Sequence, residues 1–437
     1  MSKVHLPMML LCASLWVQGG YAQDTRVLTL EQIYALADEN SKTIKVEDAA
    51  VVEAQQNVEV ARNAYLPDID ISLSGSFLGN GYLMDRNFTN GQCIKMPHWG
   101  NNFSVQATQL IYGGGTVTHS VAMAKLKQEM ASVNREASRS RVRFMLTGFY
   151  LDLYKLKNLL KVYDRNIELA QIIIKDTKTR YGTGVALSND VTRYELQLKN
   201  LELAKRRTVN AIEILNYDLV TMLGLPADAQ IEPDSTLVVQ SLPKHNLAYW
   251  QDEARQNSPA VKQSALAVKM GERGELLARA ERLPKVALVA ANHFDGPITI
   301  EVPTINKNYN YWYVGVGVSF KLSSLYKAKR TIKQAHYNTL MNRTRREETL
   351  EQIEMAVQAD YTKYNEAYDE VETLKKNVQL ANENYQVVEK RYRNDIALVT
   401  DMIDASNQLL DAELQLVNAQ INVIYKYYQL KNTSGNL

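Results

Sequence analysis

Most of the chain alternates apolar and polar residues with the period of an α-helix. From Val318 to Ser434 the sequence has neither glycine nor proline, the residues that end or kink a helix. The pattern predicts one helix from Ser324 to Arg393, about 100 Å long at the usual rise per residue, and another through the residues after Met402. In the helix from Ser324 to Arg393, apolar residues occupy the same position of seven consecutive heptads: Leu350, Val357, Tyr364, Val371, Val378, Tyr385 and Tyr392.

The first half of the chain carries a similar stretch, from Gly115 to Tyr181, without proline and with only Gly148 inside it. A short break follows each long helix, at Gly182 to Gly184 in the first half and at Asn394 to Asp395 in the second. Glycine and asparagine tolerate the left-handed conformation that ends a helix. Both breaks are therefore predicted to be tight turns between antiparallel helices.

The period changes from helical to two after the Leu-Pro pairs at 66–67 and 283–284. The alternation predicts two β-hairpins, at about 67–112 and 284–322. Strands with one apolar and one polar face suit a membrane, although a half-buried sheet of a soluble protein has the same pattern. Four strands are fewer than the roughly eight of the smallest closed barrels. If these strands lie in lipid, several subunits must share the barrel, because open edges are not tolerated there.

The sequence indicates two copies of one unit. Ala61 to Pro67 returns as Ala278 to Pro284, an offset of 217 residues, and Arg180 returns as Arg391, an offset of 211. The shared order of helix, hairpin, long helix, turn and helix favours duplication over chance similarity between helices. The predicted division is 23–226 for the first copy, 227–250 for a linker or equatorial segment, and 251–437 for the second copy.

The N-terminal residues have the pattern of a secretory signal peptide over 1–22, with Lys3 before an apolar stretch and small residues at its end. A membrane anchor is the alternative, but the apolar stretch is short for a spanning helix. Cleavage would leave one cysteine, Cys93, so an intrachain disulfide is not expected. The net charge of +2 gives no argument for a nucleic-acid partner.

The residue types that carry enzymatic chemistry do not form a recognisable motif. The histidines after the signal lack the spacing of metal ligands, and the sequence has neither a nucleophile elbow nor a complete phosphate-binding loop. Gly113, Gly114 and Gly115 are interpreted as a strand-to-helix turn, because no Lys-Ser/Thr follows them. We therefore expect no enzyme activity, no cofactor and no metal site.

Asp401 and Asp404 form a carboxylate pair just after the second turn. Three residues apart, they share one face of the predicted helix, where like charges disfavour the helix slightly. They are either solvated residues of a first helical turn, favoured by the helix dipole, or a functional acidic pair. The residues alone leave both possibilities open.

The whole plan resembles the TolC family of outer-membrane factors. The resemblance rests on Ala-Tyr-Leu-Pro at 64–67, Gln-Leu-Ile-Tyr-Gly-Gly-Gly at 109–115, Arg-Tyr-x-x-x-(Val/Ile)-Ala-Leu at both turns, and the segment 400–409, which is similar to the family's gate helix. It implies a mainly α-helical homotrimer with a shared 12-stranded outer-membrane β-barrel, continued by a long periplasmic α-helical barrel. The implied function is the outer-membrane channel of a tripartite efflux or type I secretion system, served by a periplasmic adaptor and an inner-membrane pump or transporter.

The resemblance also implies roles for particular residues. Asp401 and Asp404 would form acidic rings at a periplasmic gate that opens like an iris, and a multivalent cation could block it. Asp190 and Tyr392 match the positions of a hydrogen bond that latches the closed state. Ala397 stands where some members carry an arginine of that latch, which puts its charged part in doubt. The adaptor-contacting tips would comprise Gly182, Gly184, Val185, Leu187, Asn394, Asp395 and Leu398.

A structural periplasmic coiled coil, acting as adaptor or tether, is the competing interpretation, and the duplicated hairpins argue against it. The sequence does not identify the exported substrate, because selectivity in such systems lies mostly in the pump. It also does not identify the adaptor and pump, or a role for Cys93.

Overall fold

The computed structural model describes residues 25–234, 242–243, 245–394 and 396–437. The predicted signal peptide therefore lies outside the described residues, as do Asp395 and part of the predicted linker. The chain divides into two compact units, one comprising residues up to Ala37 together with 149–240 and the other comprising 38–148 and 241–437. Helix α3 (Thr116–Gly182) begins in the second unit and continues into the first.

The first unit joins a short parallel strand pair to two long helices. Strand β1 (Thr25–Leu28) pairs with β6 (Gln230–Pro233), and α1 (Leu30–Asn40) follows β1. The later part of α3 runs beside α4 (Ser188–Leu223), and the ion pair between Lys178 and Glu195 joins them. The β1–β6 pair was not predicted from the sequence.

Tyr150 connects the last residue of β1 to the residue that follows β6. Its hydroxyl donates to the Leu28 carbonyl at 2.9 Å and accepts from the Asp234 backbone N–H at 2.8 Å. Burial raises the pKa of this phenol to about 12. The side chain is almost fully buried, so these two bonds satisfy a hydroxyl that water does not reach.

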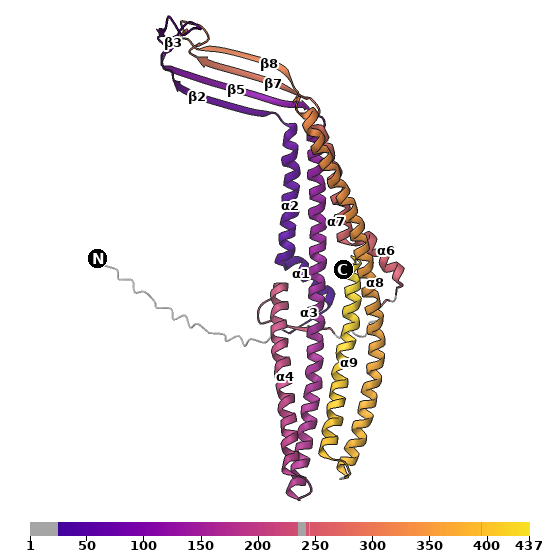
Figure 1. The fold of residues 1–437 in the computed structure, drawn as a ribbon. Coiled ribbons are helices and arrows are strands. Elements are labelled where there is room, and N and C mark those ends of the chain that lie inside the picture. The colour runs from indigo at the N-terminus through magenta and orange to yellow at the C-terminus, as the bar shows by residue number, and fades with distance from the viewer. Residues whose placement is uncertain (1–24, 235–241, 244, 395) are drawn as a thin grey trace, which may run out of the picture. The chain divides into compact units, whose positions relative to one another are not determined.

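The second unit contains the predicted hairpins, which join into one antiparallel sheet in the order β2-β5-β7-β8. The first hairpin comprises β2 (Asp68–Phe77) and β5 (Trp99–Tyr112), with a small β3–β4 ladder (Gly81–Leu83 and Gln92–Ile94) in its loop. The second comprises β7 (Lys285–Gly296) and β8 (Tyr309–Ser319). Both predicted hairpins are confirmed, and β2 and β8 are the edges of the sheet within the chain (Figure 1).

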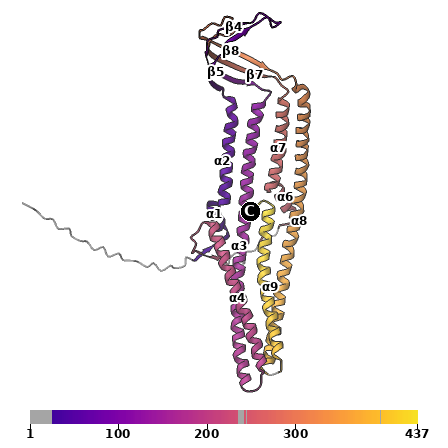
Figure 2. The ribbon, with the colours of Figure 1, turned by 60° about the vertical axis from the view of Figure 1, so that its left-hand side comes forward.

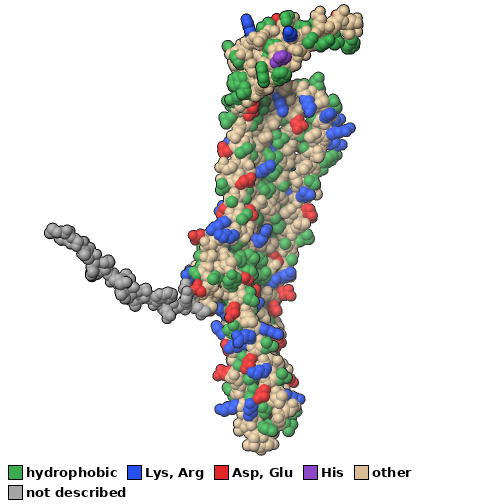
Figure 3. Space-filling model, turned by 90° about the vertical axis from the view of Figure 1, so that its left-hand side faces the viewer, with side chains coloured by type: hydrophobic (Ala, Val, Ile, Leu, Met, Phe, Trp, Pro, Cys, Tyr) green, Lys and Arg blue, Asp and Glu red, His purple; other side chains and the backbone are tan. Residues whose placement is uncertain are grey.

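One face of this sheet is apolar and exposed. Residues opposite one another in the ladder share a face, so Ile71 and Trp312 lie on the same side as the other apolar residues of their strands. Their exposed fractions run from 62% to 77%: Ile69, Ile71, Leu73, Phe77, Trp312, Val314, Val316 and Val318. Figure 3 shows that charged side chains are frequent along the helices and sparse on the sheet in that view.

The turn that returns the chain from β5 to α3 depends on glycine. Gly114 and Gly115 have φ values of +67° and +85°, which L side chains rarely adopt. A Cβ at Gly114 would lie 2.8 Å from Leu283 Cβ, so the glycine turn of the first copy fits closely against the Leu-Pro segment of the second. The interpretation of these glycines as a strand-to-helix turn is confirmed.

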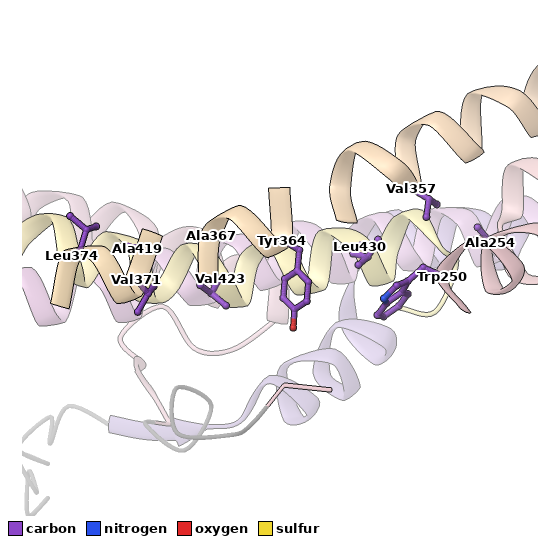
Figure 4. Close-up of a cluster of buried hydrophobic side chains, with 10 residues drawn as sticks. All are labelled: Trp250, Ala254, Val357, Tyr364, Ala367, Val371, Leu374, Ala419, Val423 and Leu430. Carbon is purple, nitrogen blue, oxygen red and sulfur yellow. The ribbon is translucent and has the colours of Figure 1, made fainter. Parts of the chain in front are cut away.

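The remaining helices of the second unit are α2 (Lys42–Arg62), which is followed by the short 3₁₀ turn Asn63–Tyr65, α6 (Leu247–Asn257), α7 (Pro259–Ala280), α8 (Ser324–Arg393) and α9 (Val399–Thr433). Helix α8 has the predicted bounds, and α9 runs back along it (Figure 2). Five of the seven predicted heptad positions are buried: Val357, Tyr364, Val371, Tyr385 and Tyr392. Several of these pack with residues of α6 and α9 around Trp250 and Leu430 (Figure 4).

Asp360 joins α8 to the C-terminal end of α9. Its side chain is buried, with 7% of its surface exposed. One carboxylate oxygen accepts from Gln429 Nε2 at 2.8 Å and the other from Thr433 Oγ1 at 2.7 Å. The pair of bonds fixes the register of the two helices, because sliding either helix by a turn would leave a buried carboxylate without partners.

A second carboxylate joins the end of α1 to α3 within the same unit. Asp38 accepts from Arg139 Nε at 2.9 Å and from Arg143 Nη2 at 2.6 Å. Burial favours the neutral acid, but the two guanidinium groups outweigh it and lower the pKa of Asp38. Among the described residues, no helix combines the length and apolar content needed to cross a bilayer.

Candidate functional site

The predicted gate pair lies at the start of α9. The N–H groups of Asn394 and Ile396 bond to the Arg391 carbonyl, at 3.2 and 2.9 Å, and satisfy the end of α8. Asn394 has φ −97°, so it does not adopt the left-handed conformation that asparagine tolerates. The backbone bonds just described close this helix end without a left-handed residue at that position.

Asp401 caps α9. Its Oδ2 atom accepts from the Leu398 backbone N–H at 3.0 Å, which satisfies a donor that precedes the first helical turn. The carboxylate also lies at the positive end of the helix dipole. Asp401 therefore makes a specific capping bond in the solvated first turn that the sequence allowed.

Asp404 is exposed on the next turn of α9 and, among the residues that the structure describes, accepts no hydrogen bond and forms no ion pair. Between the two aspartates Met402 is buried, and Ala405 is buried directly after them. The apolar residues anchor the helix against α8 while both carboxylates remain in solvent. An exposed acidic pair on a packed helix could attract cations, but a ring of such pairs requires further copies of the chain.

The first unit has a corresponding tip between α3 and α4. Gly182 ends α3, and Gly184 has φ +78°, so here the predicted left-handed turn is confirmed. The Val185 N–H bonds to the Arg180 carbonyl at 2.9 Å. Asp190 Oδ2 then accepts from the Leu187 N–H at 3.0 Å, the same cap that Asp401 makes on α9.

Both tips present apolar side chains to solvent at matching positions. Val185 and Leu187 in the first unit, and Ile396 and Leu398 in the second, have between 61% and 73% of their surface exposed. Nothing within 4 Å of Gly182 or Gly184 would meet an added Cβ, so this turn is open on its outer side.

The two predicted latch residues differ in their surroundings. Tyr392, in the last turn of α8, is only 6% exposed. Asp190 is half-buried and has one oxygen engaged by the α4 cap. The two residues belong to different compact units, so the hydrogen bond between them stays a prediction. Ala397, half-exposed, offers no charge to it.

The capping role that Asp190 and Asp401 share was not predicted from the sequence. Its signal was present, since each aspartate stands three residues after a leucine that directly precedes the helix. The free thiol of Cys93 is exposed on β4, in the loop of the first hairpin. The described part of the chain contains no group of histidine, cysteine and carboxylate side chains arranged to hold a metal ion.

Solved structures share this fold. The outer membrane protein VceC of Vibrio cholerae has 14% identity over 93% of this chain and 96% of its own, with a TM-score of 0.76. The CmeC outer membrane channel of Campylobacter jejuni has 14% identity over 93% and 85%, with a TM-score of 0.74. The open MtrE outer membrane channel of Neisseria gonorrhoeae has 16% identity over 93% and 88%, with a TM-score of 0.70. No curated protein sequence matches the chain.

The family model described as outer membrane efflux protein matches residues 33–224 and 250–436, which is most of the chain. The match confirms the resemblance drawn from the motifs. It describes proteins of transport rather than catalysis, located in the outer membrane. The chain belongs to the outer membrane efflux protein family.

Proposed function

We propose that three copies of this chain close a twelve-stranded barrel in the outer membrane and conduct solutes through it. The observation that carries the proposal is the four-stranded sheet, which has both edges open and an exposed apolar face. Its strands alternate in direction, so β8 of one copy can continue the antiparallel order with β2 of the next. Two copies would give a barrel of about eight strands, and side chains fill the interior of a barrel of that size. Twelve strands give a wider barrel that leaves room for a channel.

Two neighbouring substitutions on the central strand β5 test the membrane sheet. Val105 lies on the apolar face and Gln106 on the opposite one. Lysine on a lipid-facing strand position costs about 2–4 kcal/mol per chain near the bilayer midplane. We expect Val105→Lys to abolish heat-labile trimers in the outer-membrane fraction, and Gln106→Lys to preserve them. Equal trimer yields for the two variants, or a soluble periplasmic monomer for the unsubstituted chain, would refute the proposal.

The exposed apolar tips support a partner in the periplasm. In this proposal an adaptor docks on Val185, Leu187, Ile396 and Leu398, and passes solutes from an inner-membrane pump into the channel. The chain itself catalyses no reaction. Leu398→Glu is expected to weaken adaptor binding, measured by co-purification from detergent-solubilised membranes, while Leu203→Glu, at an exposed position within α4, leaves it unchanged. Equal co-purification of the two variants would contradict the docking site.

For the gate, Asp401 and Asp404 of three subunits would line the narrow end of the pore, and their charge would attract and hold multivalent cations. Planar-bilayer recordings with trivalent lanthanum on the periplasmic side test this. We expect block of the unsubstituted channel and none after Asp401→Asn with Asp404→Asn. Block that persists in the double variant would leave the pair as ordinary helix surface.

A further inference from the structure

Four aromatic rings form a column on the polar face of the sheet. Tyr309 and Tyr311 have ring centroids 5.3 Å apart, Tyr311 and His293 5.0 Å, and His293 and Tyr313 6.1 Å, with interplanar angles of 14° to 25°. The column follows β8 with one ring from β7, because His293 is the ladder partner of Tyr311. The three tyrosines remain 37% to 55% exposed.

Anchoring in lipid does not account for these rings. Aromatic residues that anchor membrane strands belong to the lipid-facing side. The column lies on the opposite side, which Tyr311 shares with Ser72 and Ser104, whereas Trp312 lies on the apolar side with Ile71 and Val105. When the apolar face meets lipid, the column faces the lumen.

One end of the column is open. Two residues beyond Tyr313 on the same face is Gly315, where an added Cβ would have nothing within 4 Å. The sheet surface above Gly315 is therefore open at the position that follows Tyr313 on this face. A planar ring placed over Gly315 would extend the stack by one member.

The charges of this face favour a cation. The strand residues that share it include the carboxylates of Asp68, Asp70 and Asp295, against one ammonium group, Lys285. Closure of the barrel brings β2 of one subunit, with two of these carboxylates, beside β8 of the next. Aromatic rings and nearby carboxylates together recognise planar organic cations.

We infer that Tyr313 and Gly315 form a binding site for planar aromatic cations in the lumen of the barrel. The site rests on the proposed channel. An exported solute of this class would stack on Tyr313, and the excess of carboxylates on this face would favour its positive charge. Each trimer would contain three such sites.

Ethidium, a planar aromatic cation, is the probe, titrated against the detergent-solubilised trimer and followed by fluorescence polarisation. The background is Asp401→Asn with Asp404→Asn, so that the gate carboxylates do not bind the dye. Removing one stacking ring weakens binding by about tenfold. We expect this loss for Tyr313→Leu, which removes the ring, and for Gly315→Leu, which fills the space. Trp312→Leu removes a ring from the opposite face and should change nothing.

Equal affinity in the Tyr313→Leu and unsubstituted chains would overturn the inference, and so would an equal loss in Trp312→Leu. Competition by tetraethylammonium as strong as by an aromatic cation would show that charge alone binds. An unheated gel reports the trimer independently. If the unsubstituted chain forms no trimer, the proposed channel is refuted. If the Tyr313→Leu variant forms the trimer and still binds ethidium with full affinity, only the binding site is refuted.

Discussion

Replacing Asp401 by asparagine and by alanine separates the cap of α9 from the charge of the proposed gate. Asparagine keeps a side-chain oxygen that can accept from the Leu398 N–H, now 3.0 Å from Asp401 Oδ2, but it carries no charge. Alanine removes the oxygen and the charge together. A gate that depends on charge should respond to both substitutions, and the helix start mainly to alanine.

The magnitudes follow from that one bond. Loss of a capping bond destabilises a helix start by about 1 kcal/mol, which corresponds to about fivefold more frequent opening of the first turn. Asparagine loses only the interaction of the charge with the helix dipole, about 0.5 kcal/mol at an exposed site. The substitution also removes one of the two carboxylates that each subunit contributes to the ring, so lanthanum block should shorten without vanishing.

Hydrogen exchange of the amides at the start of α9 measures the cap, and planar-bilayer recording measures the block. Asp190→Ala is the matched control for the exchange measurement, because Asp190 makes the same 3.0 Å cap on α4. It should speed exchange at the start of α4 and leave exchange at the start of α9 unchanged. Unaltered exchange in Asp401→Ala would refute the capping argument, and undiminished block in Asp401→Asn would refute the contribution of its charge.

Three further predictions concern stability. Asp360→Ala removes two hydrogen bonds to a buried carboxylate and should speed exchange at the C-terminal end of α9 about 100-fold, whereas exposed Asp369→Ala on the same helix should not. Asp38 has a lowered pKa in the folded chain, so its carboxylate stabilises the fold at pH values above its ordinary pKa of 3.8. That stabilisation is lost as the pH falls through the folded-state pKa. Asp38→Asn should remove this pH dependence of the free energy of unfolding in urea and cost about 2 kcal/mol at pH 7. Gly114→Ala should destabilise more than Gly184→Ala in the same assay, because both have positive φ but only Gly114 would collide with a neighbour; equal losses would show that φ alone matters.

The periodicity of the sequence was enough to predict the long helices and the two hairpins, because each apolar position repeats at the spacing of its own element. The bounds of α8 and the two hairpins follow directly from this. The pairing of β5 with β7 does not, since it joins strands that are far apart in sequence and depends on how the two copies pack. The β1–β6 pair was missed for a related reason, as two four-residue strands carry too few positions to show a period.

The candidate site was predictable only as far as its residues act within one chain. Alternation and resemblance located Asp401, Asp404 and both tips, but the capping bonds depend on backbone geometry that residue type alone does not specify. Gly184 adopts the left-handed conformation and Asn394 does not, because asparagine permits that conformation without requiring it. The ring and the latch depend on neighbouring copies and on the placement of two units, which neither periodicity nor a single chain contains.

The duplication itself indicates which aspartate is specific to the gate. With the offset of 211 residues, Asp401 corresponds to Asp190, and Asp404 corresponds to Arg193. Asp190 and Asp401 each cap a helix, so the need for a cap explains why an aspartate stands at this position in both copies. Asp404 has no such structural role among the described contacts, and the first copy carries the opposite charge there. Asp404→Arg should therefore abolish lanthanum block and favour anions while exchange at the start of α9 stays unchanged. If block survives Asp404→Arg but disappears in Asp401→Asn, the capping residue carries the gate charge and this assignment is wrong.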